Sequence, residues 1–335
     1  MIKLAIDLGS SVTKIYRADT NNGIVLAEPS CVAVVGAENA VRAIGKEAKY
    51  LIGKTAEMTN IVYPIVEGCI YNLPLAVVML KEFLSRVGVN AGIARSVQVL
   101  MSVPCGINEQ DLSGYKELVE ECGIRKVWFV EQPYLAVLGA GAVIEGDPIF
   151  CLDIGGGVTN AAVVSCDGII AGLSMNVGGK NIDDDIIAKV SENKKLWIGA
   201  LTAECIKNEI ASVEDTVRGS IVAEGSSSET FQPAATPIYA EEVTESVRMT
   251  LRKASDYAST VLWNLPAEVA AAVKRNGVCL SGGVLKIPGA ARYLAERIGM
   301  RYRLCEEPQF TTVLGGGMLL QDKALMKRFA KKSED

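Results

Sequence analysis

Residues 150–164, FCLDIGGGVTNAAVV, decide the fold class of this chain. An apolar strand ends at Asp153, three glycines follow, and a second apolar segment begins directly after them, which is typical of two strands joined by a tight turn. The N-terminus repeats the pattern: in residues 1–16, MIKLAIDLGSSVTKIY, Asp7 and Gly9 end one strand and small polar residues lead into the next. A glycine triplet alone is often only a turn, but two turns with an aspartate in the same place predict a common ligand.

The residue types in these two turns predict that the ligand carries phosphate groups. Glycine and serine let backbone N–H groups crowd around an anion, because no bulky side chain stands in the way. Carboxylates beside phosphates would repel them, so Asp7 and Asp153 are interpreted as groups that hold a hydrated Mg²⁺, which usually keeps several waters. Lys14 is placed to add a positive charge to the same phosphates. Two ordinary hairpins with solvated aspartates are the alternative.

The composition predicts a cytosolic protein of two globular domains. The chain has 335 residues, of which 49% are hydrophobic and 22% are charged, so each half is long enough for its own core. The formal net charge of -5 argues against a nucleic-acid groove, and no membrane-length apolar run or signal-peptide pattern occurs. There is no histidine, which excludes histidine acid–base and triad chemistry, and the nine cysteines contain no C-x-x-C pair that would indicate a metal site.

Hydrophobic patterning divides the chain into two halves built on one plan. The first half is predicted to contain strands at 4–7, 13–17, 31–35, 97–103 and 126–130, and helices at 74–87, at 109–122 and after Pro133. The second half begins at Ile149 with strand, turn, strand and a further strand, followed by helices from Asp183, at 202–213 and at 240–264 and by a polar hairpin or loop at 223–236. A third glycine turn, Gly282 and Gly283, follows a buried strand near the C-terminus.

Taken in order, these elements resemble the nucleotide site of the actin, Hsp70 and sugar-kinase superfold. The two aspartate–glycine hairpins, the E-x-x-K helix of Glu204 and Lys207 and the late strand–Gly–Gly element carry the resemblance. Within that superfold the chain is similar to the MreB/Mbl-type bacterial actins, the filament-forming cell-shape proteins. Segments that resemble the family run from end to end, among them NGIVLAEPSCVAVV, AIGKEAKYLIGKT, EQPYLAVLGAG, LDIGGGVTNAAVVS, NVGGKNIDDDII, TAECIKNEIASV, LPAEVAAAVKRNGVCLSGGVL and EEPQFTTVLGGGMLL.

The resemblance implies an α/β, actin-like (ribonuclease H-like) fold of two domains, each a mixed β-sheet flanked by helices, with the nucleotide in the cleft between them. Domain I is expected at 1–145, with a smaller subdomain at about 30–70, and is completed by 311–335. Domain II is expected at 146–310, with a smaller subdomain at about 186–245.

The resemblance also implies which residues bind ATP or ADP and Mg²⁺. Asp7 and Asp153 would hold the metal. Glu204 and Lys207 would contact the nucleotide, and the alternative is that they form an ion pair with each other on the exposed face of a helix. The expected nucleotide-binding residues are Asp7, Gly9, Ser10, Ser11, Lys14, Gly155, Gly156, Gly157, Gly178, Gly179, Glu204, Lys207, Gly282 and Gly283. The expected catalytic residues are Glu131, Gln132, Asp153 and Thr159.

Three features depart from the family pattern. Gln132 stands where the family commonly has a second glutamate, so an amide would orient the attacking water but would not remove its proton. Lys14 stands where the family usually has no lysine. Residues 88–96, GVNAGIARS, occupy the place of a membrane-inserting loop and offer only Ile93 as a bulky apolar side chain, so direct membrane binding stays an open question.

The main functional expectation is a filament in which ATP closes the two domains and slow hydrolysis acts as a timer for polymerisation. The subunit would associate with itself and with cell-shape or envelope proteins, not with nucleic acid, in the cytoplasm or at the inner face of the cell membrane. An Hsp70-like ATPase, to which LSGGVLKIPG at 280–289 is similar, and a small-molecule kinase of the same superfold are the alternatives. The preference for ATP over GTP also stays open.

Overall fold

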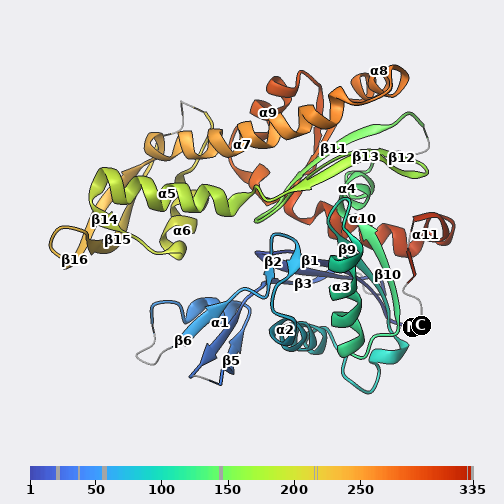
Figure 1. Cartoon of the computed structure of the whole chain (residues 1–335), viewed down its shortest axis with the longest axis horizontal. Coiled ribbons are helices and arrows are strands. Elements are labelled where there is room, and N and C mark those ends of the chain that lie inside the picture. Colours follow the sequence, from blue (N-terminus) through green and yellow to red (C-terminus); the bar gives the residue numbers. More distant parts are fainter. Residues whose placement is uncertain are drawn as a thin grey trace.

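The computed structural model describes residues 1–19, 23–36, 38–54, 59–142, 146–214, 216, 218–329 and 331–332. Two large β-sheets lie one above the other in Figure 1, and a smaller sheet accompanies each of them on the same side of the molecule. Residues 143–145, where we place the boundary between the two domains, and the C-terminal residues 333–335 lie outside the described part.

The first large sheet has six strands in the order β19-β10-β9-β1-β2-β3. Its pairs β1–β2 and β2–β3 are antiparallel, whereas β1–β9 and β9–β10 are parallel. Both faces of β1 are buried, so Leu4, Ala5 and Ile6 are apolar in succession without alternation, and Asp7 is a buried charge near the end of the strand. The strands are β1 (Lys3–Leu8), β2 (Val12–Arg17), β3 (Ile24–Pro29), β9 (Gln98–Val103), β10 (Lys126–Glu131) and β19 (Lys331–Lys332).

The second large sheet has five strands in the order β13-β12-β11-β17-β18. Its pairs β11–β12 and β12–β13 are antiparallel, and β11–β17 and β17–β18 are parallel. Five of the six strands of the first sheet, β3-β2-β1-β9-β10, have the same order of directions, so the two halves share one topology. The strands are β11 (Ile149–Ile154), β12 (Thr159–Ser165), β13 (Gly168–Met175), β17 (Val278–Ser281) and β18 (Tyr302–Leu304).

Helices cover the outer faces of both sheets. Helices α2 (Leu73–Arg86) and α3 (Glu109–Glu121) pack on the first sheet, where Leu4 and Ile6 share a hydrophobic core with them. The outer face of the second sheet packs on α5 (Gly179–Lys194), α7 (Ala240–Trp263) and α9 (Ala290–Ile298), with Leu152 in the shared core. Helix α8 (Ala267–Asn276) also contacts β11, and α11 (Lys323–Phe329) follows near the C-terminus.

Two smaller sheets stand beside the large ones (Figure 1). One consists of β4 (Val32–Val35), β5 (Ala40–Ile44) and β6 (Thr59–Val62), with helix α1 (Lys46–Tyr50) beside it. The other consists of β14 (Leu196–Trp197), β15 (Ser220–Ser227) and β16 (Pro233–Tyr239), with helix α6 (Ala200–Ile210) against β15. The remaining elements are the hairpin of β7 (Ile65–Val66) and β8 (Cys69–Ile70) and the 3₁₀ turns η1 (Ala94–Ser96), η2 (Gly283–Lys286) and η3 (Pro308–Phe310).

Most predicted elements are present, and the polar segment at 223–236 belongs to the β15–β16 hairpin. The helix predicted from Asp183 begins four residues earlier, at Gly179, because the Asn181 side chain accepts the N–H of Gly178 at 2.7 Å and caps an earlier first turn. The helix predicted at 202–213 ends at Ile210. Helix α8 was not predicted; Ala272 and Val273 are its buried residues.

Helices α4 (Gln132–Gly139) and α10 (Thr311–Gln321) lie between the two large sheets (Figure 1). One hydrophobic core joins them to both sheets, with Ala5 and Leu100 from the first and Cys151 and Cys279 from the second. The helices touch backbone to backbone: a Cβ on Gly139 would collide with the carbonyl oxygen of Thr311, and one on Gly315 would collide with that of Leu135. Glycine is therefore required at both contacts.

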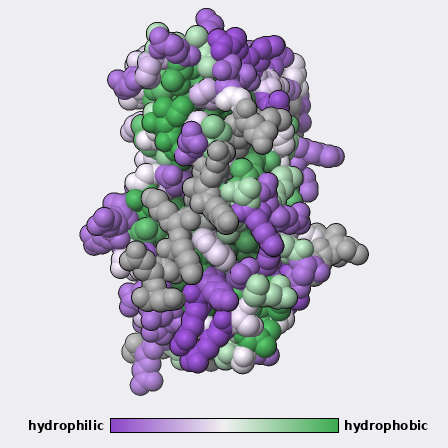
Figure 2. All heavy atoms as spheres, turned by 90° about the vertical axis from the view of Figure 1, so that its right-hand side faces the viewer, coloured by the Kyte–Doolittle hydropathy of each residue, from purple (hydrophilic) through white to green (hydrophobic). Residues whose placement is uncertain are grey.

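No helix in the described ranges is long and apolar enough to cross a membrane. Figure 2 shows the side of the molecule that lies at the right in Figure 1, where hydrophobic residues form separate patches among hydrophilic ones.

We expect Gly139→Ala and Gly315→Ala each to lower the free energy of unfolding by about 3 kcal/mol or more, because a backbone carbonyl cannot move aside as a flexible side chain can. Urea unfolding of each variant measures the loss. The matched control is Gly146→Ala, where an added Cβ meets no atom within 4 Å and the change should stay within about 0.5 kcal/mol. Unchanged unfolding midpoints in both helix variants would contradict the close contact.

Candidate functional site

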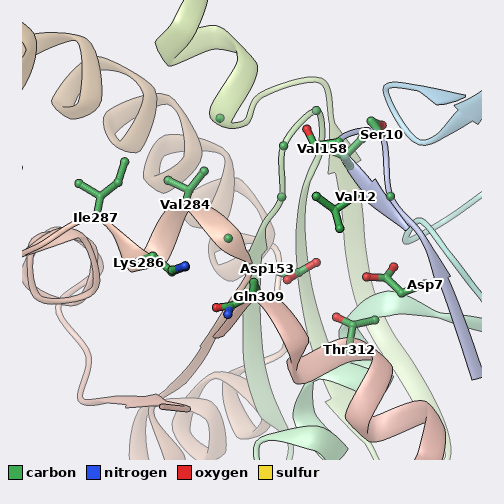
Figure 3. A pocket seen from close by; sticks show the side chains of 18 of the residues that line it. Asp7, Ser10, Val12, Asp153, Val158, Val284, Lys286, Ile287, Gln309 and Thr312 are labelled. Atoms are coloured by element: carbon green, nitrogen blue, oxygen red, sulfur yellow. The ribbon is translucent and has the colours of Figure 1, made fainter. Parts of the chain in front are cut away.

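A cavity of about 540 Å³ lies where the two large sheets face each other (Figure 3). Both aspartate–glycine turns reach it, from β1–β2 on one side and β11–β12 on the other, and η2, α6 and the start of α10 complete the wall. The lining residues are Asp7, Leu8, Gly9, Ser10, Ser11, Val12, Lys14, Gly68, Gln132, Asp153, Gly155, Gly156, Gly157, Val158, Gly179, Glu204, Lys207, Asn208, Glu209, Ala211, Gly282, Gly283, Val284, Lys286, Ile287, Pro288, Gln309 and Thr312.

The two turns come into contact with each other. A Cβ on Gly156 would collide with the Ser11 hydroxyl, and one on Gly157 would lie 3.1 Å from Ser10. The Ser10 hydroxyl also accepts the N–H of Gly68 at 3.1 Å, from the β7–β8 hairpin. Small residues are needed here because the turns of both halves close on the same space.

The N-terminus of α5 holds the second turn in place. The N–H groups of Gly179 and Lys180 donate to the carbonyl oxygens of Gly155 and Gly156 at 3.0 and 2.8 Å. A Cβ on Gly178 would lie 2.7 Å from the carbonyl oxygen of Gly155, so Gly178 allows this close packing. Gly178 does not line the cavity, whereas Gly179 does. The N–H of Gly155 is itself bonded within the turn, to the carbonyl oxygen of Val158 at 2.8 Å. Of the three glycines, Gly156 and Gly157 are therefore the two whose N–H groups make no hydrogen bond with another described residue.

The two aspartates lie at the end of the cavity where the turns meet, as Figure 3 shows. Asp7 is 5% exposed, and its carboxylate accepts hydrogen bonds from Lys14 and Ser102, both at 2.8 Å. Asp153 is 7% exposed, and burial raises the pKa of its carboxyl, with the negative charge of Asp7 adding to the effect against the opposing influence of Lys14 and Asn160. An ionised Asp153 is therefore costly unless a cation comes close.

This environment fits a divalent cation. Mg²⁺ takes oxygen ligands and keeps several waters, so two carboxylates without further protein ligands suffice. Among the described residues no group of three histidine, cysteine, aspartate or glutamate side chains is gathered as a metal site.

A network of amides links the two aspartates. The Gln132 amide nitrogen donates to Asp7 at 3.3 Å, and the Gln132 oxygen accepts from the Asn160 amide at 2.8 Å. The same Asn160 nitrogen lies 3.4 Å from Asp153, and the Asn160 oxygen accepts the N–H of Cys105 at 2.9 Å. Gln132 is thus held across the cavity floor from both sides.

Sequence reasoning did not identify Asn160 or Ser102. Asn160 pairs with Asp153 in the β11–β12 register and is 1% exposed. A single polar amide within the otherwise apolar strand TNAAVV was the signal that could have found it, because a buried polar side chain needs a partner. Ser102 lies on β9, distant from Asp7 in the sequence, so only the sheet order reveals it.

Two residues predicted to be catalytic face other partners. The Glu131 carboxylate accepts the N–H of Gly106 at 2.7 Å, and Glu131 does not line the cavity. The Thr159 hydroxyl is fully buried and donates to the carbonyl oxygen of Val177 at 2.6 Å. Of the four predicted catalytic residues, Gln132 and Asp153 are the two that line the cavity.

The opposite end of the cavity is formed by α6 and η2. Glu204 lines it, and its carboxylate forms an ion pair at 2.6 Å with Lys49 of α1. This ion pair connects the parts of the molecule that contain the two smaller sheets. Lys207 donates to Asp183 at 2.7 Å and to the carbonyl oxygen of Gly179 at 3.2 Å. Burial raises the pKa of Asp183 to about 6, although Lys207 opposes the shift.

A second contact crosses between the halves near this ion pair. The Asn176 amide, just after β13, donates to the Glu67 carboxylate of the β7–β8 turn at 2.6 Å. Gly282 and Gly283 line the far side of the cavity as predicted, and Gly282 has φ of 100°. A Cβ on Gly282 would collide with the backbone of Ile154, so the third glycine turn lies directly against the second hairpin.

The sequence model of a family described as MreB/Mbl protein matches residues 1–328. The cell shape-determining protein MreB of Escherichia coli (strain K12) is 33% identical over 330 residues, which cover 95% of this chain and 93% of that protein. The cell shape-determining protein Mbl of Bacillus subtilis (strain 168) is 30% identical over 327 residues, covering 95% of this chain and 96% of that protein.

Solved structures agree over the whole fold. MreB5 of Spiroplasma citri bound to AMPPNP superposes with a TM-score of 0.89 at 28% identity, covering 97% of each chain. The MamK double helical filament has a TM-score of 0.79 at 17% identity, covers 96% of this chain and 99% of that one, and supports the actin-like fold alone.

Proposed function

This chain belongs to the MreB/Mbl family, and we propose that it is a filament-forming bacterial actin that binds ATP in the cavity and acts in cell shape. The observation that carries the proposal is the convergence of the two phosphate-type turns on one cavity in a chain that matches the family from residue 1 to 328. The E. coli and B. subtilis relatives are cell shape-determining proteins, and the S. citri relative was solved with AMPPNP and with ADP. These matches favour a polymer over an Hsp70-like ATPase or a small-molecule kinase.

The proposed place of the phosphates is where the two turns meet. The N–H groups of Gly156 and Gly157 on one side and those of Gly9 and the two following serines on the other would donate to the β- and γ-phosphates. The N–H of Gly155, also expected to donate, is bonded to the carbonyl oxygen of Val158 instead. Asp7 and Asp153 would hold Mg²⁺ through its waters, and the metal would supply charge compensation for the phosphates. ATP or ADP is thus the expected ligand.

We expect hydrolysis to be slow. Gln132 lies between Asp7 and Asn160, where its amide orients a water but cannot accept the proton. Phosphoryl transfer depends chiefly on positioning and electrostatics, so slow turnover remains possible without a base. The sequence contains no histidine that could replace one. Hydrolysis would then act as a timer for the polymer.

The proposed partners are further copies of this chain and proteins of the cell envelope. The proposed location is the cytoplasm, including the inner face of the cell membrane. Ile93 lies just before η1 and is 37% exposed, which leaves a small apolar contact for a membrane surface in segment 88–96.

The purified protein should form sedimentable filaments in Mg²⁺-ATP at micromolar concentration. Pelleting and light scattering with ATP, with ADP and without nucleotide test this, because a nucleotide-dependent polymer gives its strongest signal in one nucleotide state. A protein that remains monomeric at every nucleotide, salt and protein concentration would overturn the proposed function.

We expect Asp153→Ala to weaken the binding of Mg²⁺-ATP about ten- to hundredfold, because the metal loses one of its two anchors. Titration calorimetry measures the affinity, and the deficit should shrink when Mg²⁺ is omitted. Asp167→Ala, which removes an exposed carboxylate at the β12–β13 turn, serves as the control. Equal affinity of the Asp153 variant and the native protein, with thermal unfolding unchanged, would show that this turn binds no metal–nucleotide complex.

Gln132→Glu should raise single-turnover ATP hydrolysis about tenfold, and Gln132→Ala should lower it, because a carboxylate can take the proton of the water that the amide only orients. The introduced carboxyl would lie beside Asp7, and the negative charge of Asp7 would raise the pKa of the introduced group. The increase in the rate of hydrolysis should therefore appear as the pH rises through the pKa of the introduced carboxyl. The pH–rate profile of the native protein should lack this rise.

These rates need variants with equal nucleotide affinity and equal filament content, because polymerisation changes turnover. Identical rates in all three proteins would assign the positioning of water to another residue.

A further inference from the structure

Three lysines line the cavity, and two of them are paired with carboxylates. Lys14 forms an ion pair with Asp7, and Lys207 forms one with Asp183. Lys286 of η2 is exposed to the cavity and makes no hydrogen bond or ion pair with any residue in the described part of the chain. Of the three lysines, Lys286 is therefore the one whose ammonium group can bind a ligand without first losing a protein partner.

The strand register places Lys286 beside the second phosphate turn. Ser281 at the end of β17 pairs with Asp153 of β11, so the residues that follow the two strands lie next to each other. The contact of Gly282 with the backbone of Ile154 brings the start of η2 against the same turn. Lys286, the last residue of η2, therefore lies close to the phosphate end of the cavity.

The side chains of η2 divide the wall into an apolar and a charged part. Val284 and Ile287 are 5% and 8% exposed, and they present carbon atoms to the cavity. In Figure 3 the Lys286 amine points away from Ile287, toward Gln309 and the side where Asp153 lies. An apolar surface suits the flat base of a nucleotide, so the ammonium faces the part of the ligand between the base and the terminal phosphates.

Gln309 provides a second sign of a polar ligand at this place. Gln309 lines the cavity, and its amide oxygen is buried without any hydrogen-bond partner. A buried acceptor of this kind needs a donor, such as a hydroxyl group of a sugar. The sugar and the phosphate attached to it are adjacent in a nucleotide, as Gln309 and Lys286 are in Figure 3.

We infer that Lys286 binds the α-phosphate of the nucleotide, the phosphate attached to the sugar. This inference rests on the proposed nucleotide function. The β- and γ-phosphates have the N–H groups of the two hairpins, and Lys286 supplies a charge-assisted bond to the phosphate nearest the base. Every nucleotide that carries a 5′-phosphate shares this bond, whatever the number of its phosphates, whereas a nucleoside does not.

The test compares adenosine, AMP, ADP and ATP by titration calorimetry on the whole chain. Lys286→Met should weaken the binding of AMP, ADP and ATP by one common factor of about ten and leave adenosine unchanged, because one charged hydrogen bond is lost. Lys286→Arg should restore most of the affinity for all three nucleotides. Lys274→Met on α8, an exposed lysine that lines none of the cavity, controls for the change in net charge and should have no effect.

Three results would overturn the inference while leaving the proposed function intact. Nucleotide affinities unaffected by Lys286→Met would place the ammonium in solvent. A loss that grows from AMP to ATP would place it on the terminal phosphates, and an equal loss for adenosine would place it on the base or the sugar. If the native protein binds no nucleotide at all, the proposed function fails and the inference fails with it.

Discussion

The crossing of α4 and α10 is the contact on which the rest of the structure depends. The side chains of these two helices share one core with both large sheets, and the helices meet through the backbone at Gly139 and Gly315. Each helix also begins at the cavity, α4 with Gln132 and α10 with Thr312 close to its start. Any change in the angle between the sheets would therefore repack this pair and move groups on the cavity floor. The close contact couples the arrangement of the halves to the geometry of the site.

The repeated topology explains why two aspartates from distant parts of the sequence face one ligand. In each half the aspartate ends a central strand that pairs antiparallel with the next strand and parallel with a later one. The turn after each aspartate must then leave the sheet at the same edge. Because the sheets face each other, Asp7 and Asp153 approach the same volume, and burial makes a cation beside them favourable.

The twin turns could be predicted from the sequence because their signal is local: an apolar strand, an aspartate and glycines within a few residues. The partners of those aspartates are harder to predict. Ser102 reaches Asp7 only through the order of the sheet, and the polar amide of Asn160 in an apolar strand indicates a buried partner without saying which one. Glu204 was expected among the nucleotide-binding residues, and it does line the cavity, but its ion pair with Lys49 depends on how the two smaller sheets approach each other. Such long-range pairings leave no periodic pattern in a single sequence.

Two surface bridges hold the two halves of the molecule shut beside the cavity. The Lys49–Glu204 ion pair is about one-third exposed on both sides, and the hydrogen bond from Asn176 to Glu67 is also at the surface. An exposed ion pair contributes roughly 0.2–1 kcal/mol and a typical hydrogen bond about 0.5–1.5 kcal/mol, and a difference of about 1.4 kcal/mol changes a population tenfold. The two bridges together thus favour the shut arrangement by roughly three- to seventyfold, and added salt weakens the ionic part. Bridges of this strength break and re-form readily, so they would be only a weak barrier to a nucleotide that passes between the halves.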